Sequence, residues 1–536
     1  MRLMQERSLL LSGMTGARRF AGTSPEARAS LSTLGCLTSL LLVVQINAAS
    51  PADTPSVIPS SLPRIGTIDQ RFQSYNIEMV EITGGKFWKP YRSQPDTQPA
   101  PRPGSDTPPG TDSNLYQYRS PIDLTQTRLR KLAAALAPAY LRVSGTWANS
   151  TYFSDSDDVL SAPPAGFNGV LTRAQWRNVV DFAHSVDARI VTSFAISTGS
   201  RDAGGSWRPD QASRFVGFTH AIGGKIAAAE FMNEPDLAAI GGAPAGYDAT
   251  AYGRDFKKFQ LFLKQSSRDT MILGPGTIGQ TALTSDLLAA SGPDLDAVSY
   301  HYYGALSERC GDSQTPEAAL SEDWLGRTDR ALAFYRDLRD RIEPGKPIWL
   351  TETAEAACGG NPWASDFLDT FRYLDQLGRL AKAGVQVVIH NTLAASDYGL
   401  LDERTLEPRP NYWGALLWRR LMGTTVLDAG LPIRLGLHVY AHCQRDMSGG
   451  VTLLVINNDR DAPHALTLPT ASMLYTLDAV DLRGARVRMN GTALALGAGD
   501  TLPSIAGTPT PAGVLTFAQR TITFVVIAGA GNGACR

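Results

Sequence analysis

Two short apolar runs decide how this chain is expected to fold: Ile226-Ala-Ala-Ala-Glu-Phe-Met-Asn-Glu-Pro235 and Lys346-Pro-Ile-Trp-Leu-Thr-Glu-Thr353. A short apolar run of this kind predicts a buried β-strand. Each run ends close to a carboxylate, Glu234 in the first and Glu352 in the second. The sequence therefore predicts two carboxylates presented by the ends of two buried strands.

Similar apolar runs alternate with amphipathic segments over most of the chain. The predicted strands are Ser74–Val80, Ala139–Val143, Arg189–Ile196, Ile226–Met232, Thr270–Leu273, Leu295–Tyr302, Pro347–Thr351 and Val385–Asn391. The helix-like segments include 122–136, 172–186, 211–222, 249–266, 324–341 and 364–382. Strand–helix alternation implies parallel strand pairing. Eight such units predict an α/β fold, a (β/α)8 TIM barrel over residues 70–425.

The pattern changes in the C-terminal part of the chain. Alternating runs such as Leu435–His442 and Val451–Ile456 are separated by Gly, Asn and Asp turns, and no segment of helical period remains. This predicts a β-sandwich domain over residues 426–536. We interpret it as a brace packed on the barrel, with a glycan-binding module as the alternative.

The first residues of the chain have the features of an export signal. Five arginines precede the apolar run Leu37–Ile46, and small residues follow it. This order predicts a leader over residues 1–49 and a secreted or periplasmic protein. The Pro/Ser-rich residues 50–69 are expected to form a flexible lead-in.

Four cysteines remain after the leader, and an even number in an exported protein suggests disulfides. Cys443 and Cys535 both lie in the C-terminal region, and Cys310 and Cys358 both follow predicted strand ends. We therefore predict the pairs 443–535 and 310–358. Four unpaired thiols are the alternative.

The charge of the chain restricts its partners. Its net charge is −1, with 19% charged residues. A slightly acidic protein is a poor non-specific binder of nucleic acid or of anionic membranes. We expect a monomer with no nucleic-acid partner and no integral membrane association.

The paired carboxylates suggest a hydrolytic site. In (β/α)8 enzymes the site lies at the carboxyl ends of the strands, and Glu234 and Glu352 follow the predicted fourth and seventh strands. Retaining glycoside hydrolysis needs one carboxylic acid as proton donor and one carboxylate as nucleophile. We assign Glu234 as acid/base and Glu352 as nucleophile. The alternative is a pair of surface glutamates at strand ends.

The segment Ser299-Tyr-His-Tyr-Tyr-Gly304 ends the predicted sixth strand. Tyr302 is our choice for orienting Glu352 through its hydroxyl, with a buried core cluster as the alternative. The role of His301 is left open. No HExxH motif or paired Cys/His ligand spacing occurs, so we expect no metal and no cofactor.

An ordered set of motifs runs along the chain: Leu141-Arg-Val-Ser-Gly-Thr146, Asn233-Glu234-Pro235, His301-Tyr-Tyr303, Trp349-Leu-Thr-Glu-Thr353 with Gly359-Gly360, Leu374-Asp-Gln-Leu-Gly378, Asp397-Tyr398 and Tyr412-Trp413. This set resembles the heparanase/β-glucuronidase family of retaining glycoside hydrolases. The resemblance covers roughly residues 70–535. It implies a barrel with a β-sandwich and retaining cleavage of β-D-glucuronides.

The resemblance also implies how an acidic sugar is bound. It places the sugar carboxylate against the backbone amides near Cys358 and Gly359 and the hydroxyl of Tyr398. Glu78, at the end of the first strand, would accept hydrogen bonds from sugar hydroxyls, and Asn233 joins the substrate-binding set. The sequence departs from animal heparanases at Ala357-Cys358, where the family has a tyrosine and a third glycine.

These features predict a retaining endo-β-glucuronidase of the heparanase type. Heparan sulfate is the favoured substrate among glucuronic-acid-containing polysaccharides, because the animal proenzyme's long linker is absent and an open cleft is expected. Basic residues near the mouth, Lys86, Lys89, Arg92 and Arg102, are candidates for sulfate contacts. The alternatives are an exo-β-glucuronidase acting on plant or bacterial glycans and a non-catalytic carbohydrate-binding protein.

Overall fold

The computed structural model describes residues 54–91 and 112–536. The expected leader, and residues 50–53 of the expected lead-in, lie outside the described residues. Across the described ranges, no helix combines the length and the apolar character that a membrane crossing requires.

Eight parallel strands close into a barrel in the order β2-β5-β8-β9-β10-β11-β12-β13. Their bounds are β2 Gln73–Glu78, β5 Ala139–Ser144, β8 Ala188–Thr192, β9 Ile226–Glu230, β10 Met271–Thr277, β11 Ala297–Tyr303, β12 Ile348–Ala354 and β13 Val387–His390. Each overlaps one of the predicted strands. The predicted (β/α)8 TIM barrel is confirmed.

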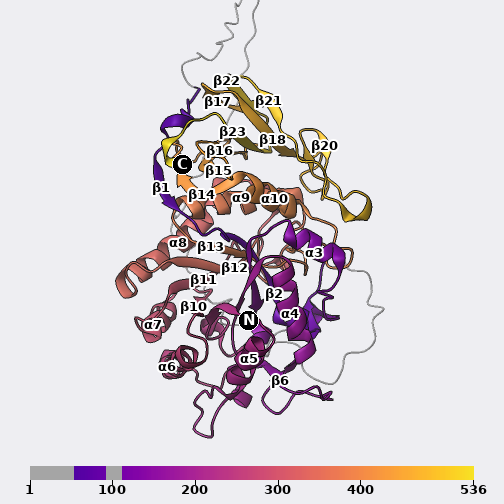
Figure 1. Ribbon diagram of the computed structural model, residues 1–536, viewed down its shortest axis with the longest axis vertical. Coiled ribbons are helices and arrows are strands. Elements are labelled where there is room, and N and C mark those ends of the chain that lie inside the picture. Colours follow the sequence, from indigo (N-terminus) through magenta and orange to yellow (C-terminus); the bar gives the residue numbers. More distant parts are fainter. Residues whose placement is uncertain (1–53, 92–111) are drawn as a thin grey trace, which may run out of the picture. The chain divides into compact units, whose positions relative to one another are not determined.

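Helices surround the barrel strands (Figure 1). They are α2 Met79–Thr83, α3 Thr127–Ala134, α4 Arg173–Ser185, α5 Asp210–Ala221, α6 Ala249–Ser266, α7 Ala282–Ser291, α8 Glu322–Ile342, α9 Phe367–Lys382 and α10 Pro410–Leu421. Thr172 caps α4, because its side chain accepts from the Gln175 N–H while the Gln175 side chain accepts from the Thr172 N–H. Such a reciprocal cap defines where a helix begins.

The inward-facing residues of the barrel strands form two groups at different levels of the barrel. An apolar group fills part of the barrel interior and includes Tyr140, Val191, Ala228, Leu273, Ala297, Trp349, Val387 and Ile389. Two residues beyond Tyr140 on β5, Arg142 lies among carboxylates. Successive inward positions of a strand are two residues apart. The interior is therefore apolar at one level and ionic at the next.

The C-terminal domain is built on an antiparallel sheet of nine strands, with the path β1-β14-β15-β16-β23-β18-β19-β20 and β21 beside β18. The bounds are β1 Arg64–Thr67, β14 Met422–Leu427, β15 His438–Gln444, β16 Val451–Asn457, β18 Ser472–Asp478, β19 Arg488–Met489, β20 Thr492–Ala493, β21 Thr508–Thr510 and β23 Thr521–Ile527. A second, two-stranded sheet pairs β17 His464–Leu468 with β22 Gly513–Phe517.

Both faces of the large sheet are covered by other elements. Leu466 of β17 and Leu515 of β22 share a core with residues of the large sheet that include Val455. On the other face Tyr440 and Phe524 belong to the same buried cluster as the helices α9 and α10 of the barrel. Barrel helices thus cover the face that the small sheet leaves free.

The expected flexible lead-in is wrong for residues 54–69. Within this segment, strand β1 pairs antiparallel with β14 at the edge of the large sheet. Val57 and Leu62 are buried in the core of the sheet domain. Local composition favoured a loop, and the strand exists only because a partner edge several hundred residues later supplies its hydrogen bonds. The predicted C-terminal domain, residues 426–536, therefore lacks strand β1, which comes from the N-terminal part of the chain.

A buried ionic cluster joins the sheet domain to the barrel helices. His438 of β15 lies 2.6 Å from Asp375 of α9 through Nδ1 and 2.8 Å from Glu322 of α8 through Nε2. Tyr440 and Arg379 also donate to Asp375, each at 2.6 Å. Burial opposes the charged imidazolium, but Asp375 and Glu322 outweigh burial and raise the pKa of His438 to about 9.

We expect His438→Ala to destabilise the protein by about 3 kcal/mol, because it removes a cationic partner from a fully buried carboxylate. The control is His464→Ala, which removes a partly exposed pair with Asp459 and should cost less than about 1 kcal/mol. The pKa of His438 in the folded protein lies above the ordinary value of about 6.5. Its contribution to the free energy of unfolding is therefore complete below pH 6.5 and is lost as the pH rises through about 9. Denaturant unfolding at several pH values measures both effects, and equal losses in the two variants would contradict the role of the cluster.

Candidate active site

Glu234 follows β9 in an unusual backbone conformation. Its φ and ψ are 46° and 69°, in the left-handed region, and Pro235 follows it. A non-glycine residue in this region costs free energy and persists only where its surroundings hold it. Asn149 supplies that support, since its side chain donates to Asn233 O at 2.8 Å and accepts from Asn233 N at 2.9 Å.

Glu352 reaches the barrel interior because β12 contains an irregularity beside it. The pairing of β11 with β12 passes from Tyr300↔Leu350 to His301↔Glu352, so Thr351 is an extra residue on β12. Thr351 still points inward and donates to Glu230 at 2.7 Å. A β-bulge of this kind re-aims the side chains that follow it. As a result Glu352 lies level with His301.

The two predicted catalytic carboxylates lie close together. One oxygen of Glu234, one oxygen of Glu352 and a ring nitrogen of His301 lie within 4.8 Å of one another. His301 Nδ1 is 3.1 Å from Glu234 Oε1 and 3.8 Å from Glu352 Oε2. The structure therefore places His301, whose role the sequence left open, between the two glutamates.

Arg142 is the cation at the centre of the site. It donates to Glu352 Oε2 at 2.7 Å, to Glu230 Oε2 at 2.8 Å and to Asn233 Oδ1 at 2.8 Å. Its side chain has no solvent exposure. Ser299 and Thr351 donate to the other oxygen of Glu230. Neither Arg142 nor Glu230 was among the predicted site residues, although a charged residue inside a buried strand is a signal for both.

The surroundings shift the pKa values of Glu234 and Glu352 in opposite directions. Burial raises the pKa of Glu234, and the negative charge of Glu352 raises it further, although His301 opposes the shift. Burial also disfavours the ionised form of Glu352, but His301, Arg142 and the Tyr303 hydroxyl outweigh burial and lower its pKa. Glu234 is biased towards the acid and Glu352 towards the anion, which matches the predicted roles.

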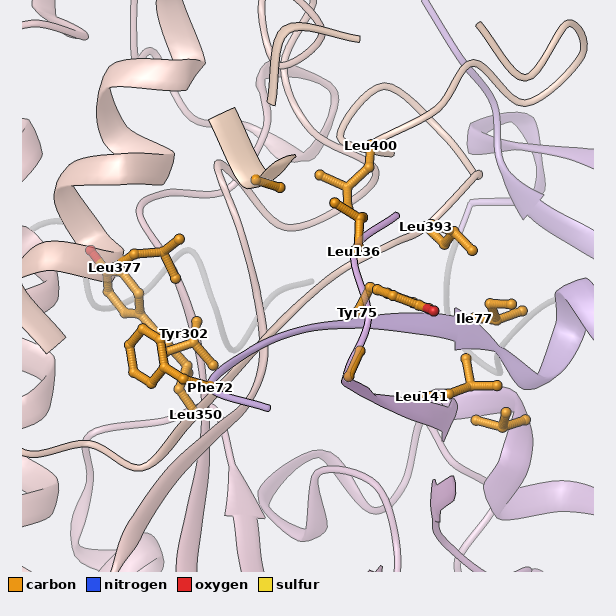
Figure 2. Close-up of a cluster of buried hydrophobic side chains, with 14 of the residues drawn as sticks. Phe72, Tyr75, Ile77, Leu136, Leu141, Tyr302, Leu350, Leu377, Leu393 and Leu400 are labelled. Carbon is orange, nitrogen blue, oxygen red and sulfur yellow. The ribbon is translucent and has the colours of Figure 1, made fainter. Parts of the chain in front are cut away.

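The prediction that Tyr302 orients Glu352 is wrong, and the neighbouring Tyr303 makes the contact. Tyr303 donates from its hydroxyl to Glu352 Oε1 at 2.6 Å. Tyr302 faces outward into the hydrophobic core, in the cluster that also contains Leu350 and Leu377 (Figure 2). The physical reason is strand alternation, which puts His301 and Tyr303 on the inner face and Tyr302 on the outer one.

A chain of hydrogen bonds runs from Glu352 to Tyr398. Asn391 donates from Nδ2 to the Tyr303 hydroxyl at 2.9 Å and lies 3.4 Å from the Tyr398 hydroxyl. Asn76 donates to Asn391 Oδ1 at 3.1 Å. Tyr398, predicted to bind substrate, is thereby connected to Glu352. Asn391 was missed, because no sequence pattern distinguishes it.

The predicted binding loop after β12 has a backbone suited to anions. Cys358, Gly359 and Gly360 all have positive φ, at 60°, 83° and 85°. Their three N–H groups make no hydrogen bond to any residue in the described ranges. Oriented backbone N–H groups in such turns form concave anion sites. A Cβ on Gly359 would lie 2.6 Å from the Trp88 side chain, so the close approach requires glycine there.

Both disulfides join the cysteines that the sequence paired. Cys310 is bonded to Cys358, and Cys443 to Cys535. The first joins the loop after β11 to the predicted binding loop. The second joins β15 to the chain end.

Glu78 ends β2 and faces the same region. It is buried, and its Oε2 has no hydrogen-bond partner within the described part of the chain. Burial raises the pKa of Glu78 well above its ordinary value, and the charge of Glu352 adds to the shift. A Cβ on Gly145 would lie 1.4 Å from Oε2, so a glycine leaves this carboxyl its space.

Among residues 54–91 and 112–536, Glu234, His301 and Glu352 are the one group spaced closely enough to hold a metal ion. Arg142 already places a guanidinium 2.7 Å from Glu352. A cation there would meet direct charge repulsion. The geometry thus favours proton chemistry over metal binding.

The predicted sulfate-binding residues are only partly described. Lys86 lies on β3, Gly85–Trp88, which pairs with β4, Tyr116–Arg119. Lys89 follows β3 and is exposed. Arg92 and Arg102 lie outside the described residues.

We expect Tyr303→Phe to lower kcat/KM for an aryl glycoside substrate about 10- to 100-fold, because a hydrogen bond to a charged group contributes roughly 1.5–3 kcal/mol. Tyr302→Phe is the matched control on the outer face of the same strand, and its kcat/KM should stay within about twofold of wild type. Steady-state kinetics of both variants separate the two tyrosines. A larger loss in Tyr302→Phe would contradict the assignment.

The opposite pKa shifts predict a bell-shaped pH dependence of kcat/KM. Activity should fall at low pH as Glu352 is protonated below its lowered pKa, and at high pH as Glu234 loses its proton above its raised pKa. Glu234→Gln should remove the alkaline limb with an aryl leaving group that needs no proton. An alkaline limb that persists unchanged in this variant would assign it to another group.

Comparisons with known proteins relate this chain to a family of glycoside hydrolases. The sequence model of glycosyl hydrolase family 79, N-terminal domain, matches residues 120–378. Heparanase of Mus musculus is 29% identical over 479 residues, which cover 77% of this chain and 88% of that protein. Heparanase-like protein 1 of Arabidopsis thaliana is 27% identical over 450 residues, which cover 79% of this chain and 76% of that protein. Baicalin-beta-D-glucuronidase of Scutellaria baicalensis is 28% identical over 275 residues, covering 48% and 51%.

Solved structures share the fold at low sequence identity. A 4-O-alpha-L-rhamnosyl-beta-D-glucuronidase from Fusarium oxysporum 12S has a TM-score of 0.60 and 14% identity, covering 88% of this chain and 99% of that one. An alpha-L-arabinofuranosidase from Thermotoga maritima has a TM-score of 0.59 and 12% identity, covering 88% and 99%. At this identity the likeness supports the fold alone.

Proposed function

Because this chain belongs to glycosyl hydrolase family 79, we propose that it hydrolyses β-D-glucuronide bonds with retention of configuration, Glu234 acting as acid/base and Glu352 as nucleophile. The observation that carries the proposal is the close pair of glutamates with opposite protonation bias. An intact pair argues against a non-catalytic carbohydrate-binding protein.

The proposed reaction has two displacements. Glu352 attacks the anomeric carbon while Glu234 delivers its proton to the glycosidic oxygen, so the leaving group departs as an alcohol and a glycosyl-enzyme ester forms. Glu234, now ionised, then takes a proton from water as the water oxygen attacks the same carbon. The ester bond breaks, Glu352 regains its charge, and Glu234 regains its proton.

The remaining residues bind the acidic sugar in this proposal. The N–H groups of 358–360 and the Tyr398 hydroxyl receive the sugar carboxylate, because fixed backbone donors suit an anion. Glu78 and Asn233 contact sugar hydroxyls. Asn233 is held ready, since Arg142 binds its Oδ1 and leaves the amide group Nδ2 to donate.

Endo cleavage of heparan sulfate is the proposed activity. One support is the similarity to mouse heparanase over most of that protein's length. The other is the short connection between Gly145 and β8, because without the animal proenzyme's long linker the cleft is expected to be open. Two disulfides suit an oxidising compartment, so we also propose export. Exo cleavage of single glucuronides is the second candidate, favoured by the similarity to baicalin-beta-D-glucuronidase.

Digestion of size-defined heparan sulfate separates the two candidates. We expect fragments of intermediate length, which require internal cuts. Release of glucuronate from chain ends alone would replace the endo proposal with the exo one, and inertness towards every glucuronide tested would remove both.

We expect Glu352→Ala to lower turnover of an aryl β-D-glucuronide by about 10⁴-fold or more, because the covalent step is lost. Azide should restore turnover and give the inverted glycosyl azide, since it attacks from the side that the missing carboxylate vacates. Product configuration by NMR measures this outcome. A retained azide from this variant would contradict the assignment of Glu352.

A further inference from the structure

The binding loop after β12 is tied to the loop after β11 by main-chain hydrogen bonds. Gly304 N donates to Glu355 O at 3.1 Å, Ala357 N to Ala305 O at 2.9 Å, and Ser307 N to Ala357 O at 3.2 Å. The disulfide from Cys310 to Cys358 continues the same seam. The two loops therefore form one unit along the wall of the site.

A third loop holds the opposite side of the same turn. Gly359 O accepts from Ser396 Oγ at 2.9 Å and from Asp397 N at 3.2 Å. Tyr398 follows directly in that loop. The carbonyl of Gly359 is thus held by the loop after β13, while the N–H groups of residues 358–360 donate to no residue in the described ranges.

A buried glutamate that the proposed mechanism does not use holds the far end of the turn. Glu355 lies three residues after Glu352 and has no solvent exposure. Its carboxyl accepts from Asn361 N at 3.0 Å and from Asn361 Nδ2 at 2.8 Å. Asn361 Oδ1 in turn accepts from Glu308 N at 2.9 Å, which reaches the loop after β11.

We propose that Glu355 is a positioning residue that, through Asn361, holds the backbone N–H groups of residues 358–360 ready for the carboxylate of an acidic sugar and so determines selectivity for uronides. The proposal rests on the proposed function, because it concerns the same turn. The Cys310–Cys358 disulfide serves the same purpose from the other side.

The physical argument is preorganisation. Three consecutive positive φ values are disfavoured for a free loop, above all at the non-glycine Cys358. Without its ties the turn would adopt other conformations, and part of the carboxylate-binding free energy would be spent on ordering it. Closing the turn at both ends removes this cost before substrate binds.

The charge of Glu355 is compatible with this role. Burial and then the negative charge of Asp369 raise the pKa of Glu355 to about 8, although the two hydrogen bonds from Asn361 and the charge of Arg372 oppose the shift. A largely neutral carboxyl near neutral pH accepts hydrogen bonds without repelling a bound anion.

The test compares two substrates that differ only in the sugar carboxylate, an aryl β-D-glucuronide and the aryl β-D-glucoside with the same leaving group. For Glu355→Ala we expect kcat/KM on the glucuronide to fall about 10- to 100-fold, mainly through KM, while the glucoside changes less than about threefold. Asn361→Ala should reproduce the effect. Glu355→Gln, which keeps an acceptor for Asn361 N, should retain more of the selectivity.

Matched controls separate positioning from general stability. Glu343 is also buried, but it follows α8 ahead of β12 and is not part of the binding loop, so Glu343→Gln should leave the glucuronide-to-glucoside ratio unchanged. Cys310→Ser should lower the ratio. Cys443→Ser, which breaks the other disulfide, should not. Thermal unfolding of each variant records how much stability is lost.

The outcomes are distinguishable. A lowered ratio in Glu355→Ala, Asn361→Ala and Cys310→Ser, with both controls unchanged, supports the proposal. Equal losses on both substrates would overturn it, since they indicate a merely structural role. If Glu355→Ala fails to fold, an unchanged ratio in Asn361→Ala and Cys310→Ser overturns it as well. A wild-type enzyme without preference for the glucuronide would instead refute the proposed function on which it rests.

Discussion

The site depends on one buried cation. Arg142 has no contact with solvent and pairs with two carboxylates, Glu230 at the end of β9 and Glu352 on β12. A buried guanidinium is costly unless its charge is matched and its donors are used. Here two separate strands of the barrel supply the carboxylates that balance this charge. The same contacts hold Glu352 as an anion and position Asn233, so the ion pair links the fold to the chemistry.

Glu234, Glu352 and the residues that support them come from several strands of the barrel, and their side chains reach the site by different routes. His301 and Tyr303 follow simple alternation along β11. Glu352 depends on the extra residue in β12, and Glu234 on a left-handed backbone beyond the end of β9. Two local departures from regular structure thus bring the carboxylates together. Such departures persist because Arg142, Asn149 and His301 hold the side chains in place.

Three further ties give the surroundings of the site their rigidity. The loops after β11, β12 and β13 are joined around residues 358–360 by main-chain bonds, a disulfide and Glu355. On the other side of α9, the His438–Asp375 pair holds the sheet domain against the barrel. Strand β1 closes the edge of that sheet with residues from the N-terminal part of the chain. The sheet domain is thus joined to the barrel at helix α9.

The sequence alone determined the eight-stranded barrel, the antiparallel sheet domain, both cysteine pairs and the two glutamates at strand ends, because periodicity, turn residues and short motifs are local properties of the chain. Only the tertiary structure decided that Tyr303 and not Tyr302 meets Glu352, that Thr351 is an extra residue in its strand, that Arg142 and Glu230 form the central pair, and that residues 64–67 join a sheet completed several hundred residues later. The face and register of a strand, and the partner of a buried charge, are set when distant segments pair and the barrel closes, and no local pattern contains that information.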